Sequence, residues 1–389
     1  MSGSWSDNEG VTALSRTADG LTGLAAAIPA RRHIAPSNDA APAELPIQNL
    51  PAHVKFARIW AERGAGILSQ KQTRPCPLCG DTRRTTWFPT QDGYRYAICD
   101  VCGMIHIPEV LPLDVWDQYF ADLPDAREFL HAQMTASIAP EALTASRERF
   151  GRYYELIGRQ YGPLNGARLL DVGTHTGGAL TIAAEAGLDA HGVEGLEEAV
   201  HFSRLHRPHL QITLGHAEDL PPAILGGAFD VVTMWETLEH TIDPMRALRN
   251  AHAALRPGGF LALTVPNARN VQCTVLREHC YFAYGGYQGI GHVNLFTPDS
   301  LRRAMRESGF ELVHVQTEFG TDWRQVLYYL QHRFDRIYCF KALVESGDFM
   351  RNPEPELAVI LNWVSPALTA IENACLAGPI IVALAQRRP

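Results

Sequence analysis

The sequence predicts an α/β protein built on a doubly wound, mostly parallel sheet of seven strands, preceded by a small cysteine-containing module. Two observations support this prediction. After Gly166, short apolar runs alternate with segments of helical period, as in buried parallel strands joined by crossover helices. Before that point, the segment from Arg74 to Pro108 contains two pairs of closely spaced cysteines. The seven predicted strands are 168–172, 190–194, 211–214, 229–235, 260–265, 310–317 and 378–386.

Helices are predicted between these strands, and the best delimited one covers residues 244–255. Asp243 can cap its first turn, and Pro244 suits its first position. Gly258–Gly259 is expected to end it. The other two predicted crossover helices are 177–186 and 197–206.

The segment before the sheet, from Leu113 to Tyr161, has a helical pattern that is interrupted at Pro124 and Pro140. Its apolar residues recur with a period of three to four. We therefore expect one buried stripe, made by Phe150, Tyr153, Tyr154 and Ile157.

The composition is that of a folded protein, with 46% hydrophobic and 20% charged residues. Lysine and arginine number 34 against 42 aspartate and glutamate, which gives a net charge of −8. This balance argues against nucleic acid as a partner, because binding to a phosphate backbone needs a basic face. No apolar run reaches the ~18 residues of a membrane span, and the N-terminus lacks the basic start of a secretory signal. We expect a cytoplasmic protein, and the sequence leaves its oligomeric state open.

Four cysteines form two knuckles, Cys76-x-x-Cys79-Gly and Cys99-x-x-Cys102-Gly. A two-residue gap lets both thiolates of a knuckle bind one ion, and the following glycine accepts the positive-φ turn that aims backbone amides at the sulfurs. Two knuckles supply the four soft ligands of a tetrahedral Zn²⁺ site. Disulfides are disfavoured in a reducing compartment, and a redox pair would not need a second knuckle. Four protein ligands leave no position for a substrate, so we expect a structural zinc.

A glycine-containing loop lies where the first predicted strand meets its helix, in the segment Leu169–Gly178 (LLDVGTHTGG). Glycines there allow close approach of the backbone to a ligand, and a helix N-terminus offers free N–H groups to an anion. Glu194 ends the second strand, where a carboxylate is expected to bind ribose hydroxyls. Taken alone, this pattern also fits an ordinary strand–helix turn or an NAD site.

An ordered series of motifs resembles the class I S-adenosylmethionine (SAM)-dependent methyltransferases of type 11/23. It covers about residues 150–320 and the closing strand near residue 380, and it implies a Rossmann-like methyltransferase fold with SAM as the methyl donor. The motifs that carry the resemblance are Leu169–Gly178, Gly192–Glu194, Gly215–Pro221, Phe229–His240, Leu255–Phe260 and Phe296–Pro298.

The resemblance also implies which residues bind SAM. His175 departs from the family pattern by replacing the usual middle glycine of the loop, and His216 stands where an aspartate often meets the adenine amine. The implied cofactor site comprises Asp171, Gly173 and Gly177 at the methionine end with Thr174 in the same loop, Glu194 at the ribose, Ala217 and Glu218 beside the adenine, and Trp235 and Glu236 on the far wall.

Methyl transfer needs an aligned acceptor and a group that removes its proton. His240 follows the fourth strand and His292 precedes the late helix, so both should border the methyl group at the carboxyl ends of the strands. Either is a candidate general base, with Glu239 orienting one of them. The alternative is that these residues only stabilise their loops. Between them lies a loop with three tyrosines that would cover the acceptor or simply pack there: Tyr281, Tyr284 and Tyr287.

A second interpretation concerns the run Glu236-x-x-Glu239-His240. Its spacing resembles the Mg²⁺-binding motif of quinone-biosynthesis O-methyltransferases and small-RNA 2′-O-methyltransferases. Two carboxylates and an imidazole would then hold a divalent ion that lowers the pKa of an acceptor hydroxyl.

The function expected from these observations is methyl transfer from SAM to a hydroxyl or carbon of a small-molecule acceptor, such as a secondary metabolite, a sugar or a cell-envelope precursor. A zinc module ahead of the catalytic domain looks similar to deoxysugar C-methyltransferases, although the C-terminal part lacks the second large domain of that family. The alternatives are an RNA methyltransferase with a zinc module and a SAM-binding scaffold without turnover.

The expected domain organisation follows from these assignments. A segment rich in alanine, serine, glycine and proline cannot bury enough apolar surface to order itself, which predicts a disordered tail. The predicted parts are the tail 1–50, a helix plus zinc-ribbon-like module 51–110, a helical lid 111–160, and a methyltransferase domain 161–389 with a helical insert at about 321–377 and a closing strand 378–386.

Overall fold

The structure is a computed structural model in which part of the chain is described. The described residues are 68–89, 94–112, 124–276, 291–321 and 355–388, together with positions 66, 114, 115, 323 and 326. The chain separates into two compact units, residues 1–44 and 45–389, and every described residue belongs to the second. The predicted tail 1–50, the tyrosine-containing loop and most of the first half of the predicted insert lie outside the described residues.

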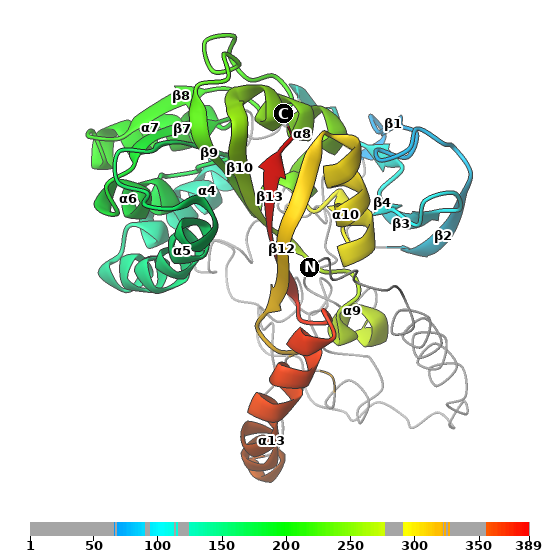
Figure 1. Cartoon of the computed structure of the whole chain (residues 1–389). Coiled ribbons are helices and arrows are strands. Elements are labelled where there is room, and N and C mark those ends of the chain that lie inside the picture. Colours follow the sequence, from blue (N-terminus) through cyan, green and yellow to red (C-terminus); the bar gives the residue numbers. More distant parts are fainter. Residues whose placement is uncertain are drawn as a thin grey trace, which may run out of the picture. The chain divides into compact units, whose positions relative to one another are not determined.

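One seven-stranded sheet carries the fold, in the order β12-β13-β10-β9-β6-β7-β8 (Figure 1). The strands from β10 to β8 run parallel, whereas β13 is antiparallel to both of its neighbours. The prediction of a doubly wound, mostly parallel sheet of seven strands is confirmed. The bounds are β6 Arg168–Val172, β7 Asp189–Glu194, β8 Gln211–Leu214, β9 Phe229–Trp235, β10 Leu255–Pro266, β12 Phe310–Glu318 and β13 Ile380–Arg387.

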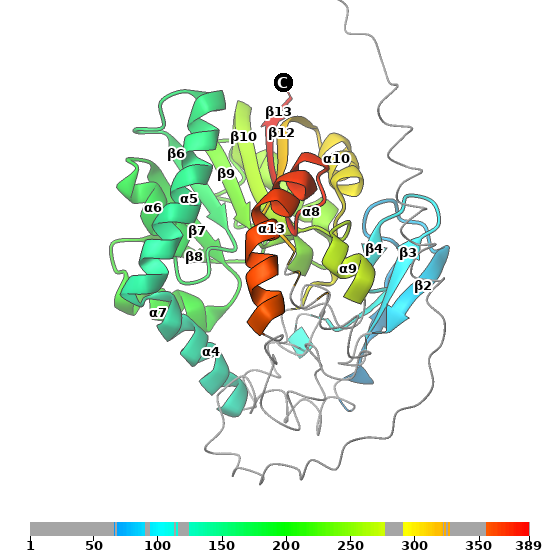
Figure 2. The same cartoon turned by 90° about the horizontal axis from the view of Figure 1, so that it is seen from below.

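Helices cover both faces of this sheet (Figure 2). Buried residues of α5, α6 and α7 pack on one face, and those of α8 and α10 pack on the other. The predicted stripe is confirmed, because Tyr153, Tyr154 and Ile157 are buried and Phe150 packs against the same cluster. The helices are α4 Pro124–Ser137, α5 Pro140–Tyr161, α6 Gly178–Glu185, α7 Glu197–His206, α8 Pro244–Ala254, α9 Val271–Leu276, α10 Pro298–Glu307 and α13 Pro355–Ala374.

Helix α8 begins as the sequence predicts, but it does not end where the sequence predicts. Asp243 caps the helix by accepting a hydrogen bond from the Arg246 backbone N–H at 2.9 Å. The helix ends at Ala254, before the glycine pair, and that pair lies inside β10. A Cβ atom on Gly259 would lie 2.9 Å from the Asp230 carbonyl oxygen. Gly258–Gly259 therefore serves the close approach of two strands rather than the end of a helix.

The cysteine module has its own sheet, in the order β11-β4-β3-β2. Three of its strands come from the cysteine segment, but the fourth comes from far along the chain, after the parallel strands. The sequence analysis did not anticipate this pairing. The strands are β2 Arg84–Pro89, β3 Arg95–Cys99, β4 Ile105–His106 and β11 Asn294–Leu295, and a separate two-stranded sheet pairs β1 Gln72–Thr73 with β5 Glu109–Val110.

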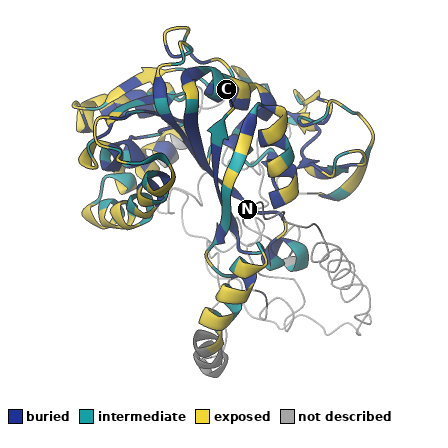
Figure 3. Cartoon of the chain, in the orientation of Figure 1, coloured by how far each residue is buried: buried dark blue, intermediate teal, exposed yellow. Residues whose placement is uncertain are grey.

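The module packs on the large sheet through a shared apolar core. Figure 3 shows the buried residues concentrated in the strands of the large sheet and on the inner faces of its helices. The core on the α8 and α10 side includes Cys76, Cys99 and Met104 of the module. None of the helices in the described part of the chain is long and apolar enough to cross a membrane.

Candidate active site and metal centre

The candidate active site lies where the order of strands reverses. The chain proceeds from β6 to β7 and β8 on one side, and then returns to β9 on the other side of β6. In such sheets the crevice beyond the carboxyl ends of the strands is a ligand site. Gly173 follows β6 with a φ of 77°, and a Cβ atom there would lie 2.5 Å from Thr237 Oγ1 in the loop after β9. The loop after β6 and the loop after β9 are therefore in direct contact.

The loop after β6 is held in a left-handed conformation at three positions, Gly173, His175 and Gly177. His175 has a φ of 50°, which is uncommon for a residue with a side chain. Its backbone N–H donates to Glu194 Oε2 at 2.7 Å, and this bond stabilises the conformation. The sequence analysis missed Arg207, a buried residue whose guanidinium donates to the Thr176 carbonyl oxygen at 2.8 Å.

Glu194 is fixed by two backbone groups at the end of β7. Its Oε2 accepts from His175 N–H, and its Oε1 accepts from Leu196 N–H at 2.8 Å. An ionised carboxylate has about four acceptor positions, so two remain for a ligand. The His216 imidazole lies against the next residue, because a Cβ atom on Gly195 would be 2.4 Å from His216 Nδ1. This arrangement suits a nucleoside whose ribose hydroxyls bind the carboxylate.

Asp171 is buried beneath the loop, with only 1% of its surface exposed. Its Oδ1 accepts a hydrogen bond from the Thr233 hydroxyl at 2.6 Å. Burial raises the pKa of Asp171 to about 6, and the nearby charge of Glu194 acts in the same direction, while the Thr233 hydroxyl opposes them. Asp171 therefore lies behind the loop as an unusually basic carboxyl group.

Two other residues implied for the cofactor site, Glu218 and Glu236, have polar partners within the protein. Glu218 Oε1 accepts from the Ile242 backbone N–H at 2.7 Å. Glu236 forms an ion pair with Arg149 of α5, with 2.9 Å between Oε1 and Nη2. Their contacts with SAM, and those of Thr174, Ala217 and Trp235, stay predictions. The ring of Trp235 is stacked on Tyr153, with centroids 4.9 Å apart.

Glu239, His240 and His292 come together at the same edge of the sheet. One potential ligand atom from each lies within 4.8 Å of those from the other two, and the two imidazole centroids are 4.9 Å apart. Glu239 and His240 lie on the 3-10 helix Leu238–His240, and His292 comes just before β11. The sequence analysis identified all three residues, and the structure shows that they form one cluster.

Glu239 has an unusual environment within this cluster. Its side chain is fully buried, and neither carboxyl oxygen has a hydrogen-bond partner among the described residues. Burial raises its pKa well above the ordinary range, and the charge of Glu236 adds to the effect. Glu236 is not part of the cluster. The motif Glu236-x-x-Glu239-His240 implies Glu236 as the third metal ligand, but in the structure His292 occupies that position.

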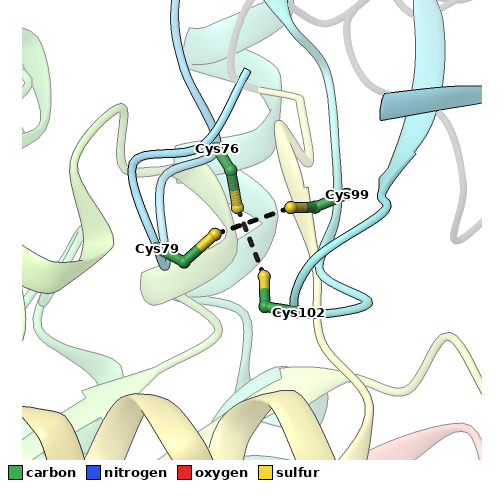
Figure 4. A group of neighbouring side chains, drawn as sticks. All are labelled: Cys76, Cys79, Cys99 and Cys102. Atoms are coloured by element: carbon green, nitrogen blue, oxygen red, sulfur yellow. Dashed lines mark hydrogen bonds between the residues drawn. The ribbon is translucent and has the colours of Figure 1, made fainter. Parts of the chain in front are cut away.

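The four knuckle cysteines converge on one point (Figure 4). The sulfurs of Cys76 and Cys102 are 3.5 Å apart, as are those of Cys79 and Cys99. This separation is too long for a disulfide bond of ~2.05 Å. Tetrahedral zinc with Zn–S bonds of ~2.3 Å places its sulfurs about 3.8 Å apart, which is close to the observed spacing. The donor set and its geometry therefore fit zinc.

The knuckle turns have the predicted conformation. Gly80 and Gly103 have φ values of 73° and 72°. Burial raises the pKa of Cys76 to about 11. Burial also acts to raise the pKa of Cys99, but the backbone N–H groups of Val101 and Cys102 and the side chains of Cys79 and Cys102 together outweigh it and lower that pKa. Backbone amides thus point at a knuckle sulfur, as expected for a thiolate that binds a metal.

Comparisons with known proteins agree with this geometry. The family model for a methyltransferase domain (Methyltransf_23) matches residues 139–315. The Ubiquinone biosynthesis O-methyltransferase of Xanthomonas euvesicatoria pv. vesicatoria is 32% identical over 169 residues, which cover 41% of this chain and 70% of that protein. The chain belongs to the class I SAM-dependent methyltransferases.

Two other curated relatives of the chain carry the same name. That of Ruegeria pomeroyi is 30% identical over 155 residues, covering 39% of this chain and 62% of the relative. That of Cereibacter sphaeroides is 34% identical over 157 residues, covering 39% and 63%. The chain thus spans less than two thirds of the length of these two relatives. Among solved structures, it is similar to an S-adenosylmethionine dependent methyltransferase from Mesorhizobium loti, with 17% identity, a TM-score of 0.38, and coverage of 58% of this chain and 93% of that one.

The environment of Asp171 predicts that its contribution to the stability of the folded protein decreases as the pH rises. Its pKa rises from 3.8 to about 6 on folding, so the folded state favours the protonated form. The stabilisation is present below pH 4, is lost as the pH rises to about 6, and stays lost above that. The asparagine side chain of Asp171→Asn does not titrate, so this variant does not lose stability over this pH range. Its melting temperature minus that of the unsubstituted protein should therefore increase from pH 4.5 to pH 7.5. The increase should correspond to at most about 3 kcal/mol in the free energy of unfolding.

Asp230→Asn is the matched control for this measurement. Partial burial acts to raise the pKa of Asp230, but the hydrogen bonds from Arg256, the Arg168 backbone N–H and Tyr161 together outweigh burial, and the pKa is lowered. The stabilisation from this ionised carboxylate is complete above the ordinary pKa of 3.8 and is lost only as the pH falls below it, so Asp230→Asn should keep a constant melting temperature relative to the unsubstituted protein over the same pH interval. Equal pH dependence in the two variants would contradict the role assigned to burial at Asp171.

Proposed function

We propose that this methyltransferase transfers the methyl group of SAM to a hydroxyl group of a small-molecule acceptor. The observation that carries the proposal is the convergence of Glu239, His240 and His292 beside the glycine loop. The name that the curated relatives carry, Ubiquinone biosynthesis O-methyltransferase, supports a hydroxyl as the acceptor. The net charge of −8 argues against RNA.

The residues around the crevice fit SAM. A side chain at Gly173 would meet Thr237, so the loop is shaped for close approach of its backbone. Helix α6 begins directly after Gly177, and its first N–H groups suit the carboxylate of the methionine end. Glu194 keeps two acceptor positions for the ribose hydroxyls. When bound, SAM supplies a methyl group that its sulfonium has already activated.

The two imidazoles are suited to take the proton of the acceptor. A neutral imidazole has one ring nitrogen that can accept a proton. Burial raises the pKa of Glu239 well above its ordinary range, which favours its protonated form. A protonated carboxyl can donate a hydrogen bond but does not take the proton. His240 and His292 are therefore the proposed bases, and Glu239 orients one of them.

Turnover measurements test this assignment. Purified protein is incubated with SAM and three acceptors: an ortho-dihydroxybenzene with an alkyl chain, a deoxysugar nucleotide, and total RNA. We expect methylation of the dihydroxybenzene hydroxyl. His240→Gln and His292→Gln should each lower kcat at least 100-fold and change SAM affinity less than threefold, because the base acts after binding.

Variants at Glu194 provide the contrast. Glu194→Ala should weaken SAM binding at least tenfold in calorimetry, whereas Glu197→Ala, an exposed neighbour on α7, should not. Methylation of RNA alone, or SAM binding without turnover of any acceptor, would overturn the proposal in favour of the two alternatives.

The environment of Glu239 favours a second arrangement of the same site. A fully buried carboxyl with two unpartnered oxygens, beside two imidazoles, is a three-ligand set for a divalent cation. Zinc, iron and manganese suit such mixed nitrogen and oxygen ligands. When bound, the cation would lower the pKa of the acceptor hydroxyl. Glu239, His240 and His292 are the residues that would hold it.

Metal analysis after dialysis against Mn²⁺ separates the two arrangements. If the cluster binds a cation, Glu239→Gln should remove one equivalent of Mn²⁺ per chain. Glu236→Gln should not, because Glu236 is paired with Arg149 and lies outside the cluster. Loss of the ion in both variants would support the ligand set that the sequence motif implied. Retention of the ion in Glu239→Gln would exclude this site.

We also propose that the four knuckle cysteines hold one structural zinc ion. Their spacing supports this assignment, and all four tetrahedral positions are filled by protein. Cys102→Ser should lose about one equivalent of zinc per chain and lower the melting temperature by more than ~5 °C, since metal binding contributes to folding. Cys375→Ser, at an exposed cysteine outside the cluster, should change neither quantity. Unchanged zinc content in Cys102→Ser would contradict the assignment.

A further inference from the structure

Two segments carry the proposed catalytic histidines, and the cysteine module contacts both of them. We propose that Arg74 and Tyr96 of this module are positioning residues, which hold His240 and His292 at the distance that methyl transfer requires. This inference rests on the function proposed above. It assigns the module a part in catalysis, although the module has no open metal position.

The first contact is a shared strand. β11 pairs with β4 in antiparallel register, with Asn294 opposite His106. The ladder continues toward the histidine, because the Ile107 N–H donates to the Val293 carbonyl oxygen at 2.9 Å. A strand in a ladder cannot shift without breaking its bonds. The module therefore fixes the path of the backbone immediately after His292.

The second contact reaches His292 itself. The Tyr96 hydroxyl donates a hydrogen bond to the His292 carbonyl oxygen. Tyr96 is fully buried, and its ring lies edge-on to Phe88 at a centroid distance of 5.5 Å. A ring held in this way places its hydroxyl at one position. The backbone of the proposed base is thus tied to the core of the module.

The third contact joins the two histidine segments. Arg74 donates through Nη2 to the Val293 carbonyl oxygen at 2.9 Å, next to His292. Through Nη1 it donates to the Ile242 carbonyl oxygen, two residues after His240. One planar guanidinium therefore bridges the segments, and its fork fixes the separation of the two acceptors. Asn294 adds a second tie, because its side-chain amide donates to the Thr241 carbonyl oxygen at 2.6 Å.

The Ile242 peptide is held from both sides. Its carbonyl oxygen accepts from Arg74, and its N–H donates to Glu218, a residue implied for the adenine side of the SAM site. Arg74 has only 9% of its surface exposed, and burial lowers its pKa to about 10, so it stays charged at neutral pH. Lysine at this position keeps the charge but loses the fork. Arg74→Lys therefore removes the two-pronged hydrogen-bonding geometry of the guanidinium and keeps its positive charge.

The experiment compares two module variants with one control. Tyr96→Phe removes the hydroxyl that binds His292, and Arg74→Lys removes the bridge. Tyr161→Phe also removes a tyrosine hydroxyl, which donates to Asp230 at the amino end of β9 and accepts from Arg256, away from the histidines. The measured quantities are kcat with the alkyl-chain dihydroxybenzene, the SAM dissociation constant, the melting temperature, and amide hydrogen exchange of peptides covering 291–296.

We expect both module variants to lower kcat at least tenfold while the SAM dissociation constant changes less than twofold, and to exchange amides at 291–296 at least fivefold faster. Tyr161→Phe should leave both quantities unchanged. A purely structural role would lower melting temperature alike in Tyr96→Phe and Tyr161→Phe, with no separate loss of kcat. Unchanged kcat and exchange in both module variants would overturn the inference.

The two proposals fail in different ways. If the unsubstituted protein shows no turnover of the dihydroxybenzene, the proposed function is wrong for that acceptor. Amide exchange at 291–296 needs no acceptor, so it still decides whether Arg74 and Tyr96 hold the segment. Turnover that persists in folded module variants with normal exchange refutes the inference and leaves the function intact.

Discussion

The contact between Gly173 and Thr237 is the constraint on which the site depends. It brings the loop after β6 and the loop after β9 together at the point where the order of strands reverses. The first loop carries the backbone amides and, through His175, the link to Glu194. The second carries Glu239 and His240. A larger residue at 173 would separate the groups that bind the methyl donor from those proposed to act on the acceptor.

The two carboxyl groups of the Glu236-x-x-Glu239-His240 run have different environments, although their spacing suggests a common task. Glu236 is exposed and forms an ion pair with Arg149. Glu239 is buried without a partner among the described residues. An isolated buried carboxyl is costly, and such groups are found where a proton, a cation or a ligand completes them. The chemistry of the site is therefore concentrated on Glu239 and its two histidine neighbours.

Much of this architecture could be predicted from the sequence, because its signals are local. The seven strands follow from apolar periodicity, and the start of α8 follows from Asp243 and Pro244. His240 and His292 could be placed at one edge because parallel strands share a carboxyl end. The role of Gly258–Gly259 could not be predicted, since it depends on the approach of β9. Nor could the bridge made by Arg74, whose acceptors lie in distant segments of the chain.

The pairing of β11 with β4 also affects how the polypeptide could be divided into fragments. A fragment ending shortly after the knuckles would lack β11, and β4 would then present an unpaired edge with buried side chains. Such edges are templates for aggregation. A fragment lacking the knuckles would leave β11 without its ladder and expose apolar surface beside α10. Although the two sheets are distinct, neither is a self-contained unit that could be exchanged between enzymes by simple recombination.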